Sequence, residues 1–168
     1  MKIGVLGDVH GRVFHALSLL GYWQRSNQTH LDLVLQAGDL GVWPVPARAD
    51  EATRHFATLD SGEFDFRRLL DADPETADAL SCVRHQLRQP VLFVRGNHDD
   101  TAWLHTLGSD QATPAAADPF GMFHYVADGT VREDSETAIA FLGGIDAPPG
   151  SPVGLDEAAY ARLCQLPA

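Results

Sequence analysis

The sequence predicts an α/β fold in which parallel strands form a sheet flanked by helices. Apolar runs at residues 2–7, 31–37 and 90–95 have the length and composition of buried strands, and segments with helical spacing separate them. Each run ends in a polar turn that contains glycine. Alternating strands and helices favour parallel βαβ units, in which ligand sites gather at the carboxyl ends of the strands. The three turns are therefore expected along one edge of the sheet.

The first half of the chain is expected to form a strand–helix unit followed by a long crossover. Residues 2–7 are predicted to be a fully buried strand and residues 12–25 a helix with apolar side chains at helical spacing. Residues 44–88, rich in Asp, Glu and Arg, separate the second and third strands. We interpret them as a crossover enlarged by a helical insertion, which either covers the site or, as favoured here, packs on the surface. Helices are expected around 48–58, 63–71 and 75–88, the last of them capped by Asp73 with Pro74 at its first position.

The second half is expected to add a second sheet. Short strands are predicted at 123–126, 130–133 and 137–142, with Asp128 and Gly129 as a hairpin turn between the first two. Helices are predicted at 101–107 and 155–166. A chain of 168 residues suffices for one domain with a substantial core, so residues 1–168 are predicted to form a single domain.

The composition disfavours several classes of protein. The formal net charge is −11, from 12 Lys and Arg against 23 Asp and Glu, so long-range electrostatics disfavour a nucleic-acid partner. No apolar run approaches the ~20 residues needed to cross a bilayer, and the N-terminus opens directly into a strand. Cys82 and Cys164 lie far apart and are expected to be reduced thiols. A cytoplasmic location with no membrane partner is therefore expected.

The polar turns carry the ligand types of a metal site. Asp8 and His10 lie two residues apart where the first strand ends, so both side chains can converge on one ion. Asp39 follows the second strand, and its two carboxylate oxygens can each hold one of two cations. Asn97 follows the third strand and offers a neutral amide oxygen to the second cation. Each turn alone is a weak signal, but three turns with matching ligand chemistry predict a metal-binding rim.

Such a rim would support phosphoester hydrolysis. Two cations roughly 3.5–4 Å apart would bind a phosphoryl group and lower the pKa of a bridging water, placing hydroxide for in-line attack. His98 is suited to protonate the leaving oxygen or to stabilise charge on the phosphoryl group. Asp99 is expected to hold the imidazole of His98 in the correct tautomer. The alternative for this third turn is a plain cap of the next helix by Asp99 or Asp100.

The three turns, in this order, resemble the signature of the calcineurin-like metallophosphoesterase superfamily: Asp-x-His at 8–10, Gly-Asp at 38–39 and Gly-Asn-His-Asp at 96–99. The resemblance implies a sandwich of two mixed sheets flanked by helices, with two divalent ions such as Mn, Fe or Zn. It implies that one ion is bound by Asp8, His10 and Asp39, and the other by Asp39 and Asn97. It also implies that His98 is the catalytic histidine.

The chain departs from this family pattern in its later part. The family continues with a lone His and a Gly-His-x-His block, whereas no histidine follows His124 here. The fold is therefore expected to be C-terminally incomplete. A truncated chain is favoured over a site completed by a partner chain, or over a non-catalytic relative that acts as a binding or regulatory module. Four of the other histidines are expected to be surface or partly packed side chains: His15, His30, His55 and His85.

The residues after Asp39 constrain the substrate class. Residues 40–43 read Leu-Gly-Val-Trp in place of the Asp-Arg-Gly continuation of protein Ser/Thr phosphatases, so the phosphate-clamping arginine of that branch is absent. Arg12 and Arg95, beside the first and third turns, are candidate substitutes for binding substrate phosphate. We therefore expect a small phosphomonoester or phosphodiester as substrate. A nuclease of the same superfamily is disfavoured by the net charge.

Overall fold

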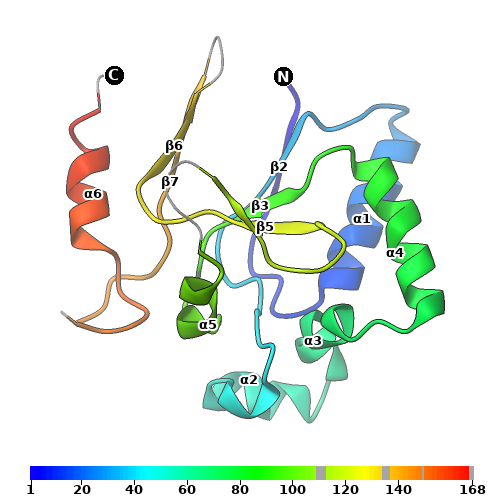
Figure 1. Ribbon diagram of the computed structural model, residues 1–168, viewed down its shortest axis with the longest axis horizontal. Helices are drawn as coiled ribbons and strands as arrows, with labels where there is room; N and C mark the ends of the chain where they lie inside the picture. Colours follow the sequence, from blue (N-terminus) through cyan, green and yellow to red (C-terminus); the bar gives the residue numbers. More distant parts are fainter. Residues whose placement is uncertain (109–112, 134–136, 149, 167–168) are drawn as a thin grey trace.

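The main sheet has five strands in the computed structural model, which describes residues 1–108, 113–133, 137–148 and 150–166. The strand order is β1-β2-β3-β5-β4, in which the first four strands pair in parallel and the short β4 is antiparallel (Figure 1). The strands span Ile3–Leu6 (β1), Leu33–Gln36 (β2), Val91–Phe93 (β3), Ala115–Ala116 (β4) and Phe123–Tyr125 (β5).

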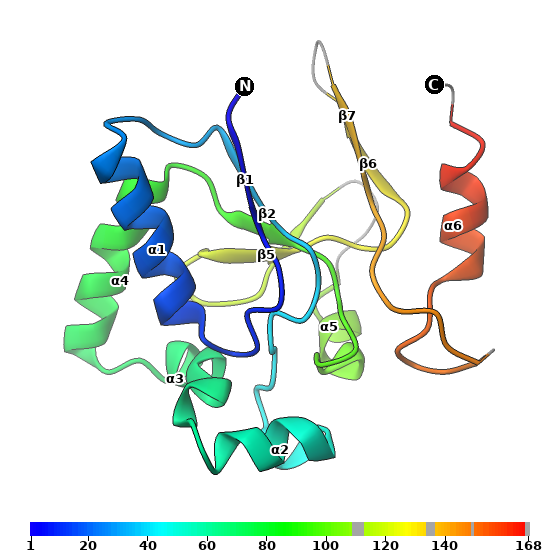
Figure 2. The same cartoon turned by 180° about the vertical axis from the view of Figure 1, so that it is seen from behind.

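Helices cover one face of this sheet. Helices α1 and α4 lie side by side over it, and α3 contacts α1 (Figures 1 and 2). Between them and the strands lies the larger apolar core, in which Phe66, Phe93 and Phe123 are fully buried. The α-helices span Val13–Ser26 (α1), Glu51–Ala57 (α2), Asp65–Leu70 (α3), Pro74–Leu87 (α4), Thr101–Thr106 (α5) and Glu157–Leu163 (α6), with 3-10 turns at Pro46–Arg48 (η1) and Ser61–Phe64 (η2).

The other face of the main sheet carries a second, smaller sheet. Strands β6 (Thr130–Glu133) and β7 (Ala138–Phe141) pair antiparallel. A second buried cluster joins Phe141 of β7 to Leu33 of β2 and Leu92 of β3. Since neighbouring residues of a strand point to opposite faces, these leucines lie on the side away from α1 and α4. The predicted arrangement of two sheets flanked by helices is confirmed.

The prediction that β1 is fully buried is wrong. Ile3 is 39% exposed and Val5 is 67% exposed. β1 is the edge strand of the main sheet, and the core beneath the second sheet includes side chains of β2 and β3 but not these two. An apolar run has the same sequence pattern in an edge strand as in a central one, so its position in the sheet was not predictable.

The prediction of a hairpin at Asp128 and Gly129 is also wrong. The strand before them, β5, pairs in parallel with β3 in the main sheet, whereas the strand after them, β6, pairs with β7. The two residues therefore connect the two sheets. The backbone N–H of Gly129 donates instead to the carbonyl of Phe141, at 2.9 Å. A long-range pairing overrides the local turn signal at this point.

The helices predicted between the second and third strands are present as α2, α3 and α4. The start of α4 agrees in detail, because Asp73 accepts a hydrogen bond from the backbone N–H of Thr76 at 2.8 Å and Pro74 is the first helical residue. α4 packs beside α1 and so works as the crossover helix of a βαβ unit. Whether residues 44–88 form an insertion relative to related proteins stays a prediction.

Two expectations from composition can be compared with the structure. No helix in the described part of the chain is both long and apolar enough to span a bilayer. Cys82 and Cys164 are both exposed and free, in agreement with two unpaired thiols.

Candidate metal centre

The loops that follow β1, β2 and β3 meet at one edge of the main sheet. Parallel pairing places Leu6 beside Gln36 and Gln36 beside Phe93, so the three strands end at the same level. The first and second loops are joined by a hydrogen bond of 2.9 Å from the backbone N–H of His10 to the carbonyl of Asp39. The edge predicted to carry the three turns is therefore present.

A glycine in the second loop permits this close approach. A Cβ atom on Gly41 would lie 2.0 Å from the backbone nitrogen of Gly11, and Gly41 adopts a φ of 81°. The N–H of Gly11 also donates to the carbonyl of Leu40, at 2.8 Å. The two loops therefore run in direct backbone contact, with no space for a side chain at position 41.

Three predicted metal ligands converge at this edge. One ligand atom from each of Asp8, His10 and Asp39 lies within 4.8 Å of the other two. Carboxylate oxygens combined with an imidazole nitrogen suit Mn, Fe or Zn. The chemistry and spacing of these side chains therefore fit a divalent cation.

The same three residues have unusual backbone conformations. Their φ angles are positive: 49° for Asp8, 46° for His10 and 56° for Asp39. A left-handed conformation at a residue other than glycine costs of order 1–3 kcal/mol and is concentrated at functional sites. In these two adjoining loops, the strained backbone conformations therefore occur at the three candidate metal ligands.

The third loop holds the carboxylate of Asp39. The Oδ1 atom of Asp39 accepts a hydrogen bond from the backbone N–H of His98 at 2.8 Å. Gly96 packs against the same oxygen, because a Cβ atom on Gly96 would lie 2.0 Å from it. Asn97 lies between these two contacts in the chain and is partly buried. The loop therefore brings Asn97 next to Asp39, and binding of a cation by its amide stays a prediction.

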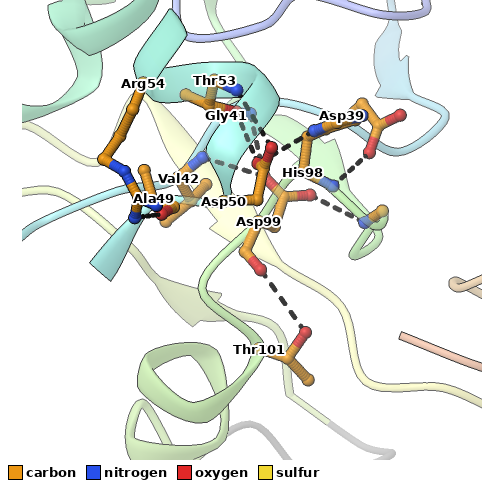
Figure 3. A network of polar contacts seen from close by, with 11 residues as sticks. Asp39, Gly41, Val42, Ala49, Asp50, Thr53, Arg54, His98, Asp99 and Thr101 are labelled. Carbon is orange, nitrogen blue, oxygen red and sulfur yellow. Dashed lines mark hydrogen bonds and ion pairs between the residues drawn. The ribbon is translucent and has the colours of Figure 1, made fainter. Parts of the chain in front are cut away.

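The imidazole of His98 contacts a carboxylate and another histidine. Its Nδ1 lies 3.0 Å from Oδ2 of Asp50 (Figure 3). The centroid of its ring lies 5.0 Å from that of His10. Partial burial, the largest single effect, lowers the pKa of His98, whereas the hydrogen bond and the charge of Asp50 raise it. Together with Asp39 and Asp99 they raise the pKa above its ordinary value. The neighbouring carboxylates therefore favour the protonated form of the ring in the metal-free protein.

The prediction that Asp99 holds the His98 ring needs correction. Oδ1 of Asp99 accepts hydrogen bonds from the N–H groups of Gly41 and Val42, each at 2.8 Å, and Oδ2 accepts one from Gly96 at 2.7 Å (Figure 3). Burial raises the pKa of Asp99, and these three donors act in the opposite direction. The carboxylate points inward and ties the second loop to the third, while the contact with the ring is made by Asp50.

Arg12 lies beside the first loop, but its charge is shared with two carboxylates. Its Nε lies 3.0 Å from Asp60, and its guanidinium lies 2.8 Å from Glu63, both on or next to η2. The Arg12 side chain is 38% exposed. Arg12 therefore joins the first loop to the segment between β2 and β3, and binding of substrate phosphate by it stays a prediction.

Arg95 is placed away from solvent. Its side chain is 5% exposed, its Nε donates to Asp128 at 2.7 Å, and another nitrogen donates to the carbonyl of Gly154 at 2.7 Å. These contacts join the residues after β3 to the connection between β5 and β6 and to the loop before α6. A guanidinium engaged in this way has no free face for a substrate, so the structure gives Arg95 a structural role.

Loss of Arg95 is expected to destabilise the fold strongly. Arg95→Met leaves Asp128 buried with its charge uncompensated, which typically costs about 3–5 kcal/mol of unfolding free energy. Urea denaturation of the metal-free protein measures this quantity. Arg95→Met combined with Asp128→Leu should recover much of the loss. A single variant within 1 kcal/mol of wild type, on the scale of an exposed ion pair, would contradict the assignment.

A comparison with protein families supports the interpretation of the three loops. A model described as calcineurin-like phosphoesterase matches residues 1–147. The chain belongs to this family. Metal-dependent hydrolysis of phosphoesters is the general activity of calcineurin-like phosphoesterases, and the group of Asp8, His10 and Asp39 is a candidate metal site of that kind. No curated protein matches the chain closely.

One site residue of this calcineurin-like phosphoesterase was not predicted from its sequence. Asp50 lies within a charged, helix-forming stretch, where an acidic residue before a helix normally indicates only a cap. The nearest available signal was Asp-x-x-Thr at 50–53, which predicts the cap and not the contact with His98. Of the two environments expected for the other four histidines, surface or partly packed, the structure shows the first, since all are exposed: His15, His30, His55 and His85.

Proposed function

We propose that this protein hydrolyses a small phosphomonoester or phosphodiester with two divalent cations, such as Mn, Fe or Zn, bound at the rim formed by the three loops. The observation that supports this most is the convergence of Asp8, His10 and Asp39 within 4.8 Å. In the proposal these side chains hold the first cation, and Asp39 and Asn97 hold the second. We place the protein in the cytoplasm.

The remaining residues of the rim orient and protonate the substrate. The bound cations would supply positive charge to the phosphoryl oxygens and a water of lowered pKa as the nucleophile. His98 would donate a proton to the leaving oxygen, because its imidazole lies beside His10 and its Nδ1 is held by Asp50. Arg12 would exchange part of its contact with Asp60 for a phosphate oxygen.

The proposed donors do not fill the coordination of two cations. Water, or a partner chain that adds ligands at the rim, would supply the other positions. The net charge of −11 opposes a polyanionic substrate such as DNA, which favours a small ester.

Metal-dependent turnover tests this proposal. Wild-type protein with Mn²⁺ is expected to hydrolyse p-nitrophenyl phosphate or its bis ester and to stop when the metal is chelated. Asp39→Asn removes the negative charge and one of the two oxygens of the shared ligand, and should lower turnover by more than about 100-fold. Asp78→Asn, at an exposed position of α4, is a matched control that should retain wild-type turnover.

Other results of the turnover assay would contradict hydrolysis of a small ester or favour a different function. Absence of metal-dependent turnover in the wild-type protein, with Asp39→Asn indistinguishable from it, would contradict hydrolysis. Metal binding without turnover would instead favour a binding or regulatory module, and faster cleavage of single-stranded DNA than of small esters would favour a nuclease.

A further inference from the structure

We propose that Asp50, the residue that caps α2, is the positioning residue for His98. Its carboxylate accepts a hydrogen bond from Nδ1 of the imidazole at 3.0 Å and thereby fixes the orientation of the ring. Nε2 is then the nitrogen that faces the reaction. The catalytic part of this inference rests on the proposed hydrolase function, whereas the structural part does not.

The carboxylate of Asp50 is itself held in one orientation. Its Oδ1 accepts a hydrogen bond from the backbone N–H of Thr53 at 2.9 Å, and its Oδ2 accepts one from the Thr53 hydroxyl at 2.6 Å (Figure 3). Oδ2 also receives the contact from His98. A carboxylate fixed by two donors from its own helix can present an acceptor to the ring without first losing rotational freedom.

The start of α2 is also tied to the third loop. The guanidinium of Arg48 lies 2.8 Å from Oδ1 of Asp100, and the backbone N–H of Asp100 donates to the carbonyl of Val42 at 2.9 Å. Arg48 and Asp50 flank the same short turn before α2, and His98 and Asp100 flank Asp99. Two separate contacts, one to each side of Asp99, therefore align the turn with the loop that carries His98.

These contacts give residues 44–88 a part in the site rather than surface packing alone. The carboxylate next to His98 in the chain is unavailable for the ring, because both oxygens of Asp99 accept backbone N–H groups. The acceptor for Nδ1 is supplied instead by a helix cap 48 residues away in sequence. Carboxylates that accept from the distal nitrogen of a functional histidine set its tautomer and orientation.

The rival explanation is that Asp50 only caps α2, and the chain contains a matched control for it. Asp73 caps α4 through the same Asp-x-x-Thr pattern, accepting from the N–H of Thr76 at 2.8 Å. Serine caps a helix about as well as aspartate. Asp50→Ser and Asp73→Ser should therefore have similar, small effects on stability, and only Asp50→Ser removes the acceptor from His98.

The direct test is an NMR spectrum of metal-free protein with ¹⁵N-labelled histidine. We expect a hydrogen-bonded Nδ1–H signal for His98 in the wild type and in Asp73→Ser, and its loss in Asp50→Ser. Asp50→Asn keeps one acceptor oxygen for the two positions that Oδ1 and Oδ2 fill, so it should restore the signal in part. An unchanged His98 signal in Asp50→Ser would overturn the proposal, whether or not the protein turns over a substrate.

The second readout is the kinetics of the metal-loaded protein on bis(p-nitrophenyl) phosphate. Asp50→Ser should lower kcat about 10- to 100-fold with little change in KM, while Asp73→Ser retains both values. Asp50→Asn should recover part of kcat. Equal losses in Asp50→Ser and Asp73→Ser would show a general effect of helix capping and would overturn the positioning role. A wild-type protein without turnover would contradict the hydrolase function and leave the NMR result to decide on Asp50.

Discussion

Replacement of Asp99 by alanine is expected to cause one of the largest losses of stability in this protein. The side chain is 3% exposed and accepts backbone hydrogen bonds from Gly41, Val42 and Gly96. Each buried N–H that loses its acceptor costs about 1–3 kcal/mol, so the three together should cost at least about 3 kcal/mol, even after relief from burying the charge. Urea denaturation of the metal-free protein measures the loss.

A second buried carboxylate provides the matched control for this prediction. Asp118 also accepts three backbone hydrogen bonds, from Phe120, Met122 and Phe123, and is 7% exposed. Asp118→Ala should destabilise the protein to a similar degree without altering metal affinity in the fraction that remains folded. Asp99→Ala should lower both the free energy of unfolding and the metal affinity, because Asp99 joins the loops that carry the metal ligands. Retention of wild-type metal affinity by Asp99→Ala would contradict this role.

The second large effect is expected from a single methyl group at Gly96. An alanine Cβ at this position would lie 2.0 Å from Oδ1 of Asp39 and 2.2 Å from its backbone nitrogen. These distances are far below van der Waals contact, so the carboxylate must move out of its place in the metal group. Gly96→Ala should therefore weaken Mn²⁺ binding by more than about 100-fold, which isothermal titration calorimetry can measure.

Gly7 gives the control for Gly96. It precedes Asp8 as directly as Gly96 precedes Asn97, yet a Cβ atom on Gly7 would meet no atom within 4 Å. Neither glycine has a left-handed backbone, so the two substitutions differ in steric contact alone. Gly7→Ala should bind Mn²⁺ within about threefold of wild type. A similar affinity for both variants would show that Gly96 does not press on Asp39.

Much of the fold was predictable because its signals are local. The strand that becomes β3 is an uninterrupted apolar run, and Asp73 with Pro74 defines the start of α4 by side-chain chemistry that acts within one turn of helix. The three polar turns lie at the ends of parallel strands, and the parallel pairing follows from helices between them. For this reason the convergence of Asp8, His10 and Asp39 is predictable from the sequence.

The remaining features depend on contacts between distant parts of the chain. The exposure of Val5 depends on which strand forms the edge of the sheet. The role of Asp128 depends on the pairing of β5 with β3. The contact with the His98 ring is made by Asp50 and not by Asp99, because of how the turn before α2 packs against the third loop. No sequence pattern within either segment contains that information.

The central claim, a divalent cation held by Asp8, His10 and Asp39, is tested most directly by Mn²⁺ binding followed by electron paramagnetic resonance. The wild-type protein and Asp78→Asn are expected to bind Mn²⁺ saturably and with equal affinity. Asp39→Asn is expected to lose affinity by at least about 100-fold. Equal Mn²⁺ binding by Asp39→Asn and the wild type would contradict the claim.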